Sequence, residues 1–204
     1  MKKGKIIFLN GVASAGKTSL AKTLQSRLSE PYYWLNVDAF ITFSAENPME
    51  HNPSTYFEEG KDPVSLYPHI IKLYSDLGVN VIADAAFTKG QGRNLFLALE
   101  TLEKCIEMLH EYPLLYVHVT CPLEEMRRRE EERGYRNIGQ SEDQLMEINP
   151  YDIYDITVDT FQNTKEECAD KIIELLEEPE KHTAFRTLRY NAKMISLLIN
   201  YFGI

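Results

Sequence analysis

The sequence predicts an α/β protein built on a parallel β-sheet with helices on both faces. Short apolar runs alternate with amphipathic segments of about 10–15 residues, the pattern of repeated β–α–β units. The first apolar run leads through a glycine-rich stretch directly into a helical pattern, and no internal repeat interrupts the alternation. The length of 204 residues fits one domain with or without an appended piece.

The predicted strands are short runs rich in β-branched and aromatic residues. They are Lys5–Asn10, Tyr32–Val37, Val79–Ala83, Leu114–Thr120 and Tyr154–Val158. The predicted helices are amphipathic or strongly charged segments. They are Lys17–Ser29, Pro63–Leu77, Gln91–His110, Pro122–Arg133 and Lys165–Glu177. Residues 39–62 contain several prolines, a glycine and aromatic residues, and they predict a long loop of the kind that covers or forms a binding site.

Composition excludes several classes of function. A net charge of −9 and a pI near 5.1 disfavour a general nucleic-acid binder or a protein of anionic membrane surfaces, because both need a basic face. No apolar run approaches the roughly 20 residues needed to span a bilayer. The three cysteines are widely spaced without a CxxC pair, which indicates a reducing compartment and argues against a zinc site. We therefore expect a soluble, cytoplasmic protein with neither nucleic acid nor membrane as partner.

One segment carries a phosphate-binding motif, G-x-x-x-x-G-K-[ST], between a predicted strand and a predicted helix. Its residues, with the serine that follows, are Gly11, Val12, Ala13, Ser14, Ala15, Gly16, Lys17, Thr18 and Ser19. Glycines let backbone N–H groups wrap a phosphate, while the lysine bridges the β- and γ-phosphates and the Thr18 hydroxyl holds Mg²⁺. The motif predicts a nucleoside triphosphate and Mg²⁺ as cofactors. The alternative is a glycine turn with a purely structural role.

Two aspartates are expected at the carboxyl edge of the sheet, where ligands of open parallel sheets bind. Asp38 follows the second predicted strand and Asp84 follows the third. Asp38 is the candidate general base that takes a proton from an acceptor hydroxyl. Asp84 is a candidate magnesium ligand acting through water. For both residues the alternative is a helix cap or a turn.

An arginine-rich segment, residues 127–140, predicts a lid. Arg133 and Arg136 flank a glycine beyond the charged helix, where guanidinium groups can close on a transferring phosphoryl group as catalytic residues. Arg127 and Arg128 lie among glutamates, and that spacing favours a solvated helix face with ion pairs.

The composition changes after residue 179, which predicts a main domain over residues 1–179 and a helical extension over residues 180–204. The extension holds four basic residues and one acidic residue, a net charge of +3, which leaves −12 for the rest of the chain because the total is −9. Two interpretations remain open: a terminal helix docked on the acidic body, or a helix that mediates oligomerisation or binds a partner.

Four blocks of sequence resemble the chloramphenicol phosphotransferase-like family over about residues 5–178. They are FLNGVASAGKTS, LQSRLSEPYYWLNVDAF, ERGYRNIG and YDITVDTFQNTKEECA. The resemblance implies a P-loop kinase with a five-stranded parallel sheet in the order 2-3-1-4-5, a lid, and ATP-dependent phosphorylation of a small-molecule hydroxyl. By motif, Asp38 resembles the family's general base, Gly11–Ser19 its phosphate loop, and Arg133 and Arg136 its lid arginines. The family pattern has two adjacent aspartates after the third strand, whereas Ala85 follows Asp84 here.

These observations together predict a phosphotransferase that moves the γ-phosphoryl group of ATP to an uncharged small molecule, such as chloramphenicol or a related antibiotic. Residues 40–60 are rich in aromatic residues, and the only Arg or Lys near them is Lys61 at their edge. A phosphorylated acceptor would need several Arg or Lys there, so this segment favours an acceptor without phosphate groups. One alternative is a kinase of a nucleoside, a sugar nucleotide or another metabolite on the same fold. Another is an ATP-binding regulatory or interaction protein.

Overall fold

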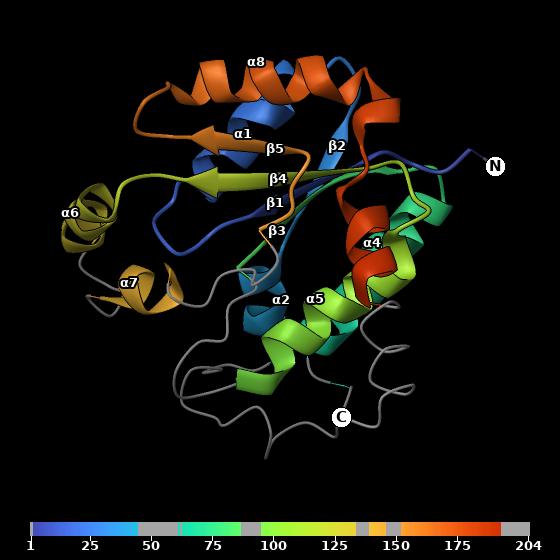
Figure 1. Cartoon of the computed structure of the whole chain (residues 1–204), viewed down its shortest axis with the longest axis horizontal. Helices are drawn as coiled ribbons and strands as arrows, with labels where there is room; N and C mark the ends of the chain where they lie inside the picture. Colours follow the sequence, from blue (N-terminus) through green and yellow to red (C-terminus); the bar gives the residue numbers. More distant parts are fainter. Residues whose placement is uncertain are drawn as a thin grey trace.

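Five parallel strands form one sheet in the order β2-β3-β1-β4-β5 (Figure 1). The sequence pattern predicts the parallel sheet, and the family resemblance implies this order. The computed structural model describes residues 2–44, 61, 63–86, 95–133, 139–145 and 152–192. Within these ranges the strands are β1 (Ile6–Asn10), β2 (Tyr32–Asn36), β3 (Asn80–Ala85), β4 (Leu114–Thr120) and β5 (Ile156–Asp159).

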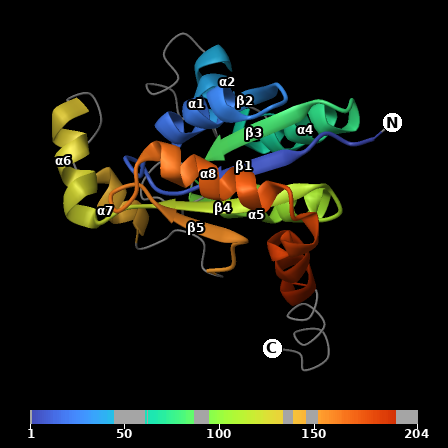
Figure 2. The ribbon, with the colours of Figure 1, turned by 90° about the horizontal axis from the view of Figure 1, so that it is seen from above.

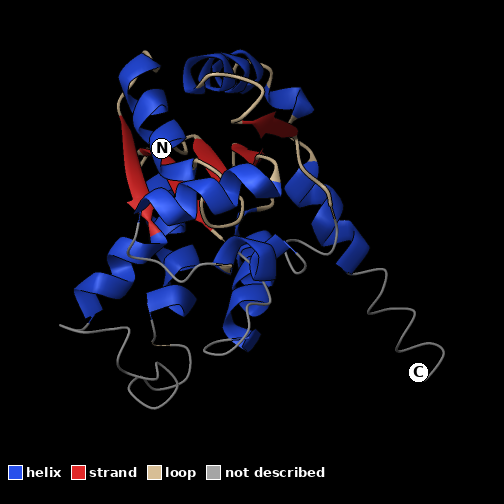
Figure 3. Cartoon of the chain, turned by 90° about the vertical axis from the view of Figure 1, so that its left-hand side faces the viewer, coloured by secondary structure: helices blue, strands red, loops and turns tan. Residues whose placement is uncertain are grey.

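Helices cover both faces of this sheet (Figures 1 and 3). α1 (Lys17–Arg27) and α8 (Lys165–Leu176) cover one face, while α4 (Pro63–Asp76) and α5 (Leu95–Leu109) cover the other. α6 (Leu123–Arg133) and α7 (Gln140–Leu145) lie beyond the carboxyl ends of β4 and β5, and α2 (Val37–Ser44) follows β2 directly. A short 3₁₀ turn, Pro179–Lys181, follows α8. In the described part of the chain, no helix is both long and apolar enough to cross a membrane.

Strand β1 is buried along its whole length, because it pairs with β3 on one side and β4 on the other. Its side chains alternate between the two faces. Ile7 and Leu9 join a cluster with residues of α1 and α8, while Ile6 and Phe8 join a cluster with residues of α4 and α5. A continuous apolar strand of this kind is typical of the centre of a parallel sheet. The segment that follows β1 therefore emerges at the middle of the carboxyl edge.

The boundaries of two strands differ from the prediction in a way that matters for the site. β3 continues to Ala85, so Asp84 lies inside the strand and does not follow it. Asn36 pairs with Asp84 in the register of β2 and β3, and the backbone N–H of Asp84 donates to the Tyr67 hydroxyl at 2.9 Å. β2 ends at Asn36, and the segment predicted as a loop from residue 39 begins within helix α2.

Helical residues 184–192 dock on the sheet (Figure 2). Ala184, Phe185 and Leu188 are buried in the core cluster of the α4–α5 face, and the Phe185 ring lies 4.9 Å from that of Tyr116. The carboxylate of Asp155 accepts hydrogen bonds from the backbone N–H groups of Thr183 and Ala184 at 2.7 and 2.8 Å. This part of the extension is thus a docked helix. Its role in oligomerisation stays a prediction, and residues 193–204 lie outside the described residues.

Replacement of Phe185 by alanine tests how far this helix supports the main core. We expect the Phe185→Ala variant to lose about 3–5 kcal/mol of unfolding free energy, because the ring is buried among aromatic neighbours. Tyr190 of the same helix is 64% exposed, and its replacement by alanine is the matched control with an expected change within about 0.5 kcal/mol. Urea denaturation measures both. Equal, small losses would show that the helix adds little to the core.

Candidate active site

The phosphate loop links the buried end of β1 to the start of α1. Gly16 has φ +101° and Ser14 has φ +61°, both in the left-handed region, and these two residues turn the chain back toward the helix. Gly11 is needed for another reason: a Cβ there would lie 2.2 Å from the carbonyl oxygen of Val119 on β4. Residues 11–15 of the loop are buried, whereas Thr18 and Ser19 are exposed on the first turn of α1.

Lys17 lies folded over the first half of this loop. Its ammonium group donates to the carbonyl oxygens of Gly11 and Val12 at 2.8 and 3.0 Å. The positive charge is thereby held at the mouth of the loop, where the motif predicts that it meets the β- and γ-phosphates.

A single pocket brings most of the predicted site residues together. Besides residues of the phosphate loop it is lined by the end of β2, the start of α2, the end of β3, the end of α6, and α7. The lining residues are Ala13, Ser14, Gly16, Lys17, Thr18, Asn36, Val37, Asp38, Asp84, Ala85, Ala86, Arg133 and Gln144. Another hollow, between α1 and the start of α8, is lined by Ser19 and contains none of the predicted catalytic side chains.

Asp38 lies in the first turn of α2 and is exposed at this pocket. A carboxylate in the first turn of a helix is favoured by the helix dipole, so the position also has a structural rationale. The side chain that accepts a hydrogen bond from the start of this helix is that of Asn36, whose Oδ1 accepts from the backbone N–H of Ala39 at 3.2 Å. Asn36 thus caps the start of α2, and Asp38 lines the pocket next to it.

Asp84 lines the pocket from β3 and is 2% exposed. Its Oδ2 accepts a hydrogen bond from Nδ2 of Asn36 at 3.0 Å. Burial raises the pKa of the Asp84 carboxyl above its ordinary value; the positive charge of Lys17 opposes this rise and the negative charge of Asp38 adds to it. Thr18 and Asp84 supply oxygen atoms on the same pocket, which is the ligand type that Mg²⁺ prefers. Among the residues whose placement is described, no group of three or more His, Cys, Asp or Glu could hold a metal ion by itself.

Of the two predicted lid arginines, the structure describes one. Arg133 ends α6 and points to the phosphate loop, with Nη1 at 3.5 Å from the hydroxyl of Ser14. Arg136 lies outside the described residues, as does the segment 134–138. Arg127 and Arg128 form exposed ion pairs with Glu142 and Glu125, which confirms the solvated helix face predicted for them.

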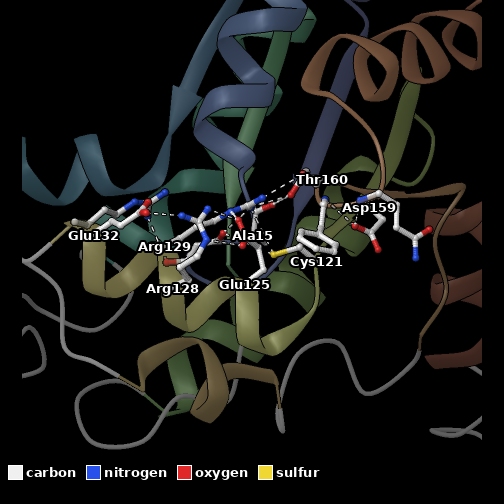
Figure 4. Close-up of polar contacts among 12 residues, drawn as sticks. Ala15, Cys121, Glu125, Arg128, Arg129, Glu132, Asp159 and Thr160 are labelled. Atoms are coloured by element: carbon white, nitrogen blue, oxygen red, sulfur yellow. Dashed lines mark hydrogen bonds and ion pairs between the residues drawn. The ribbon is translucent and has the colours of Figure 1, made fainter.

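Arg129 holds the phosphate loop from below, a role that the sequence prediction missed (Figure 4). Its guanidinium group donates to the Ser14 carbonyl oxygen at 3.1 Å and to the hydroxyl and carbonyl oxygens of Thr160 at 3.0 and 3.1 Å. Glu125 pairs with it at 2.7 Å. The Thr160 hydroxyl in turn donates to the Ala15 carbonyl oxygen at 2.7 Å. Because a trans peptide directs its C=O and N–H to opposite sides, these contacts leave the N–H groups of Ala15 and Gly16 directed away from Arg129 and Thr160.

Glu130 is a second residue that the sequence prediction missed. Its side chain is almost fully buried, and its carboxylate accepts hydrogen bonds from the backbone N–H groups of Gly139 and Ser141 at 3.0 and 2.9 Å. These contacts tie the start of α7 to α6. They also place both ends of the segment that follows Arg133 at fixed positions.

The chain is similar to a known family and to several known proteins. The family model "Chloramphenicol phosphotransferase-like protein" matches residues 4–177. A Mycobacterium tuberculosis protein named "Putative O-phosphotransferase" is 30% identical over 93% of this chain and 89% of its own length.

Two solved kinase structures share the fold at lower identity. A sugar kinase from Janibacter sp. HTCC2649 has a TM-score of 0.60 at 18% identity, covering 88% of this chain and 99% of that one. The Mycobacterium tuberculosis APS kinase, solved with AMPPNP and APS, has a TM-score of 0.57 at 18% identity, covering 87% and 99% of the two chains.

The P-loop kinase fold is thus shared with both structures, and the family match spans nearly the whole sheet together with the pocket at its carboxyl edge. The chain belongs to the chloramphenicol phosphotransferase-like family and is a kinase that acts on a small molecule.

Proposed function

We propose that the protein transfers the γ-phosphoryl group of ATP to a hydroxyl of an uncharged small molecule, with chloramphenicol or a related antibiotic as the first candidate. The observation that carries this proposal is one pocket that joins a phosphate loop to an exposed carboxylate. Lys17, Asp38 and Arg133 all line that pocket.

The described residues fit ATP and Mg²⁺. Arg129 and Thr160 hold the buried loop through the carbonyl oxygens of Ser14 and Ala15, so the peptide N–H groups that follow these carbonyls are directed away from both side chains, as a phosphate-binding loop requires. Thr18 and Asp84 would hold Mg²⁺, Asp84 through water. When bound, the ion neutralises charge on the β- and γ-phosphate oxygens.

Asp38 serves as the general base in this proposal. Its exposed carboxylate takes the proton from the acceptor hydroxyl as the acceptor oxygen bonds to the γ-phosphorus. The bond from that phosphorus to the β–γ bridging oxygen breaks at the same time, and ADP leaves. Lys17 and Arg133 neutralise the charge on the transferring group from the loop and from the end of α6. The matching role of Arg136 stays a prediction.

An uncharged acceptor fits the distribution of charge in the pocket. Among the described lining residues the cations are Lys17 and Arg133, and both are assigned to the transferring phosphate. Asp38 adds an exposed negative charge on the side of α2, which disfavours an anionic acceptor such as APS. An uncharged alcohol needs no cation to bind and is not repelled by the carboxylate.

The Asp38→Asn variant tests the base. We expect nucleotide affinity to stay within about twofold of wild type while phosphoryl transfer falls about 10²-fold or more, because an amide cannot take the proton. Isothermal titration calorimetry and a coupled ADP assay measure the two quantities. Asp76→Asn on α4 makes the same charge change away from the pocket and is the control. Unchanged turnover of Asp38→Asn would remove Asp38 from the role of base.

The identity of the acceptor is tested by mass spectrometry. The purified protein with Mg·ATP is incubated separately with chloramphenicol, with a neutral sugar and with APS. We expect one added phosphoryl group on chloramphenicol and none on APS. Transfer to the sugar alone would support an uncharged acceptor and show that the acceptor is a sugar and not the antibiotic. Transfer to APS would contradict the charge argument.

Asp84→Asn separates stability from metal binding. Because burial raises the pKa of Asp84 in the folded state, this carboxyl favours the fold while protonated and loses that contribution as pH rises through the raised pKa. We expect Asp84→Asn to raise Tm more at pH 7 than at pH 4 when EDTA is present, while the Mg²⁺ concentration needed for half-maximal activity increases. Thermal melts at both pH values check the first part. A gain that is equal at both pH values would contradict it.

A further inference from the structure

Gln144 of α7 occupies part of the phosphate loop in this structure. Its side-chain oxygen Oε1 accepts a hydrogen bond from the backbone N–H of Ala13 at 2.6 Å. Ala13 is buried, and both residues line the pocket that contains Lys17 and Thr18. A protein group therefore takes one of the loop donors on which the proposed function relies.

The position of Lys17 shows which end of the loop is involved. Its ammonium group contacts the carbonyl oxygens of Gly11 and Val12, the two residues before Ala13. The lysine of such loops reaches the β- and γ-phosphates. The N–H of Ala13 thus belongs to the half of the loop that faces the γ-phosphate. One backbone N–H is a single donor, so a γ-phosphate oxygen and Gln144 compete for it.

The helix that carries Gln144 is held independently of this contact. Glu130 binds the backbone N–H groups of Gly139 and Ser141, and Arg127 pairs with Glu142 at 2.5 Å. The side chain of Gln144 can therefore leave Ala13 by rotation while α7 stays in place. An amide is a neutral acceptor, and a charged phosphate oxygen makes the stronger hydrogen bond to the same donor.

We propose that Gln144 is a specificity-determining residue that competes with the γ-phosphate for the N–H of Ala13. This inference rests on the proposed nucleotide site. A nucleoside diphosphate leaves the contact between Gln144 and Ala13 in place, whereas a triphosphate must displace it. After transfer, Gln144 recovers Ala13 and so disfavours the return of the phosphorylated acceptor to the loop. Gln144 thus lowers the affinity for the triphosphate and leaves the affinity for the diphosphate unchanged. It also assists release of the phosphorylated acceptor.

The test compares the affinities of a non-hydrolysable ATP analogue and of ADP, each with Mg²⁺, in wild type and in Gln144→Met and Gln144→Ala. We expect both variants to bind the triphosphate analogue about two- to tenfold more tightly, the value of one neutral hydrogen bond, and to bind ADP as wild type does. Gln144→Glu should weaken the analogue, because a carboxylate holds Ala13 more strongly and repels phosphate. Gln162→Met makes the same replacement at an exposed position outside the pocket, and this control should leave the ratio of the two affinities unchanged.

The outcomes separate this inference from the proposed function. If wild type binds neither nucleotide, the proposed function fails. If wild type binds both and Gln144→Met binds the analogue more weakly, Gln144 is a phosphate ligand and the competition is wrong. If Gln144→Met tightens both nucleotides equally, or changes neither, Gln144 does not discriminate between them. Tm values of the variants exclude loss of the fold as the cause.

Discussion

The close approach of Gly11 to the backbone of β4 constrains the whole site. β1 is buried between β3 and β4, and the chain leaving it passes so near the Val119 carbonyl oxygen that no Cβ fits. The turn that follows must then be completed within a few residues, with Ser14 and Gly16 in left-handed conformations. The start of α1, and with it Lys17 and Thr18, is placed by this turn. Gly11, which the motif needs for phosphate, is thus also required by the packing of the sheet.

A second set of contacts directs the loop toward its ligand. Arg129 and Thr160 take the carbonyl oxygens of Ser14 and Ala15 from the side of α6 and β5. Arg129 of α6 and Thr160 after β5, both distant from the loop in sequence, therefore hold its carbonyl oxygens, while Gln144 contacts the N–H of Ala13 from the pocket. Preorganisation of this kind is where the protein contributes most to phosphoryl transfer, because the chemistry needs mainly positioning and charge stabilisation.

The sequence was sufficient for the sheet, its order through the family resemblance, and the phosphate loop, because spacing and periodicity encode them directly. It was not sufficient for α6. Four consecutive charged residues of this helix look alike in the sequence: Arg127, Arg128, Arg129 and Glu130. The first two are exposed, whereas Arg129 holds the phosphate loop and Glu130 holds α7. A signal was present: Met126 is the buried apolar residue of this helix, and positions three, four and seven beyond it are Arg129, Glu130 and Arg133. Gln144 left no such signal, since its partner is a backbone group far away in sequence.

The carboxylate of Glu130 has a consequence for variation of the chain. It joins α6 to the start of α7 across residues 131–138 through contacts with Gly139 and Ser141. Once the ends of a loop are fixed, doubling its length costs only about 0.6 kcal/mol of closure entropy. An insertion at this point leaves the contact between Glu130 and α7 in place, so we expect it to cost little stability. A substitution one helical turn earlier, at Glu130, would remove the contact that holds α7.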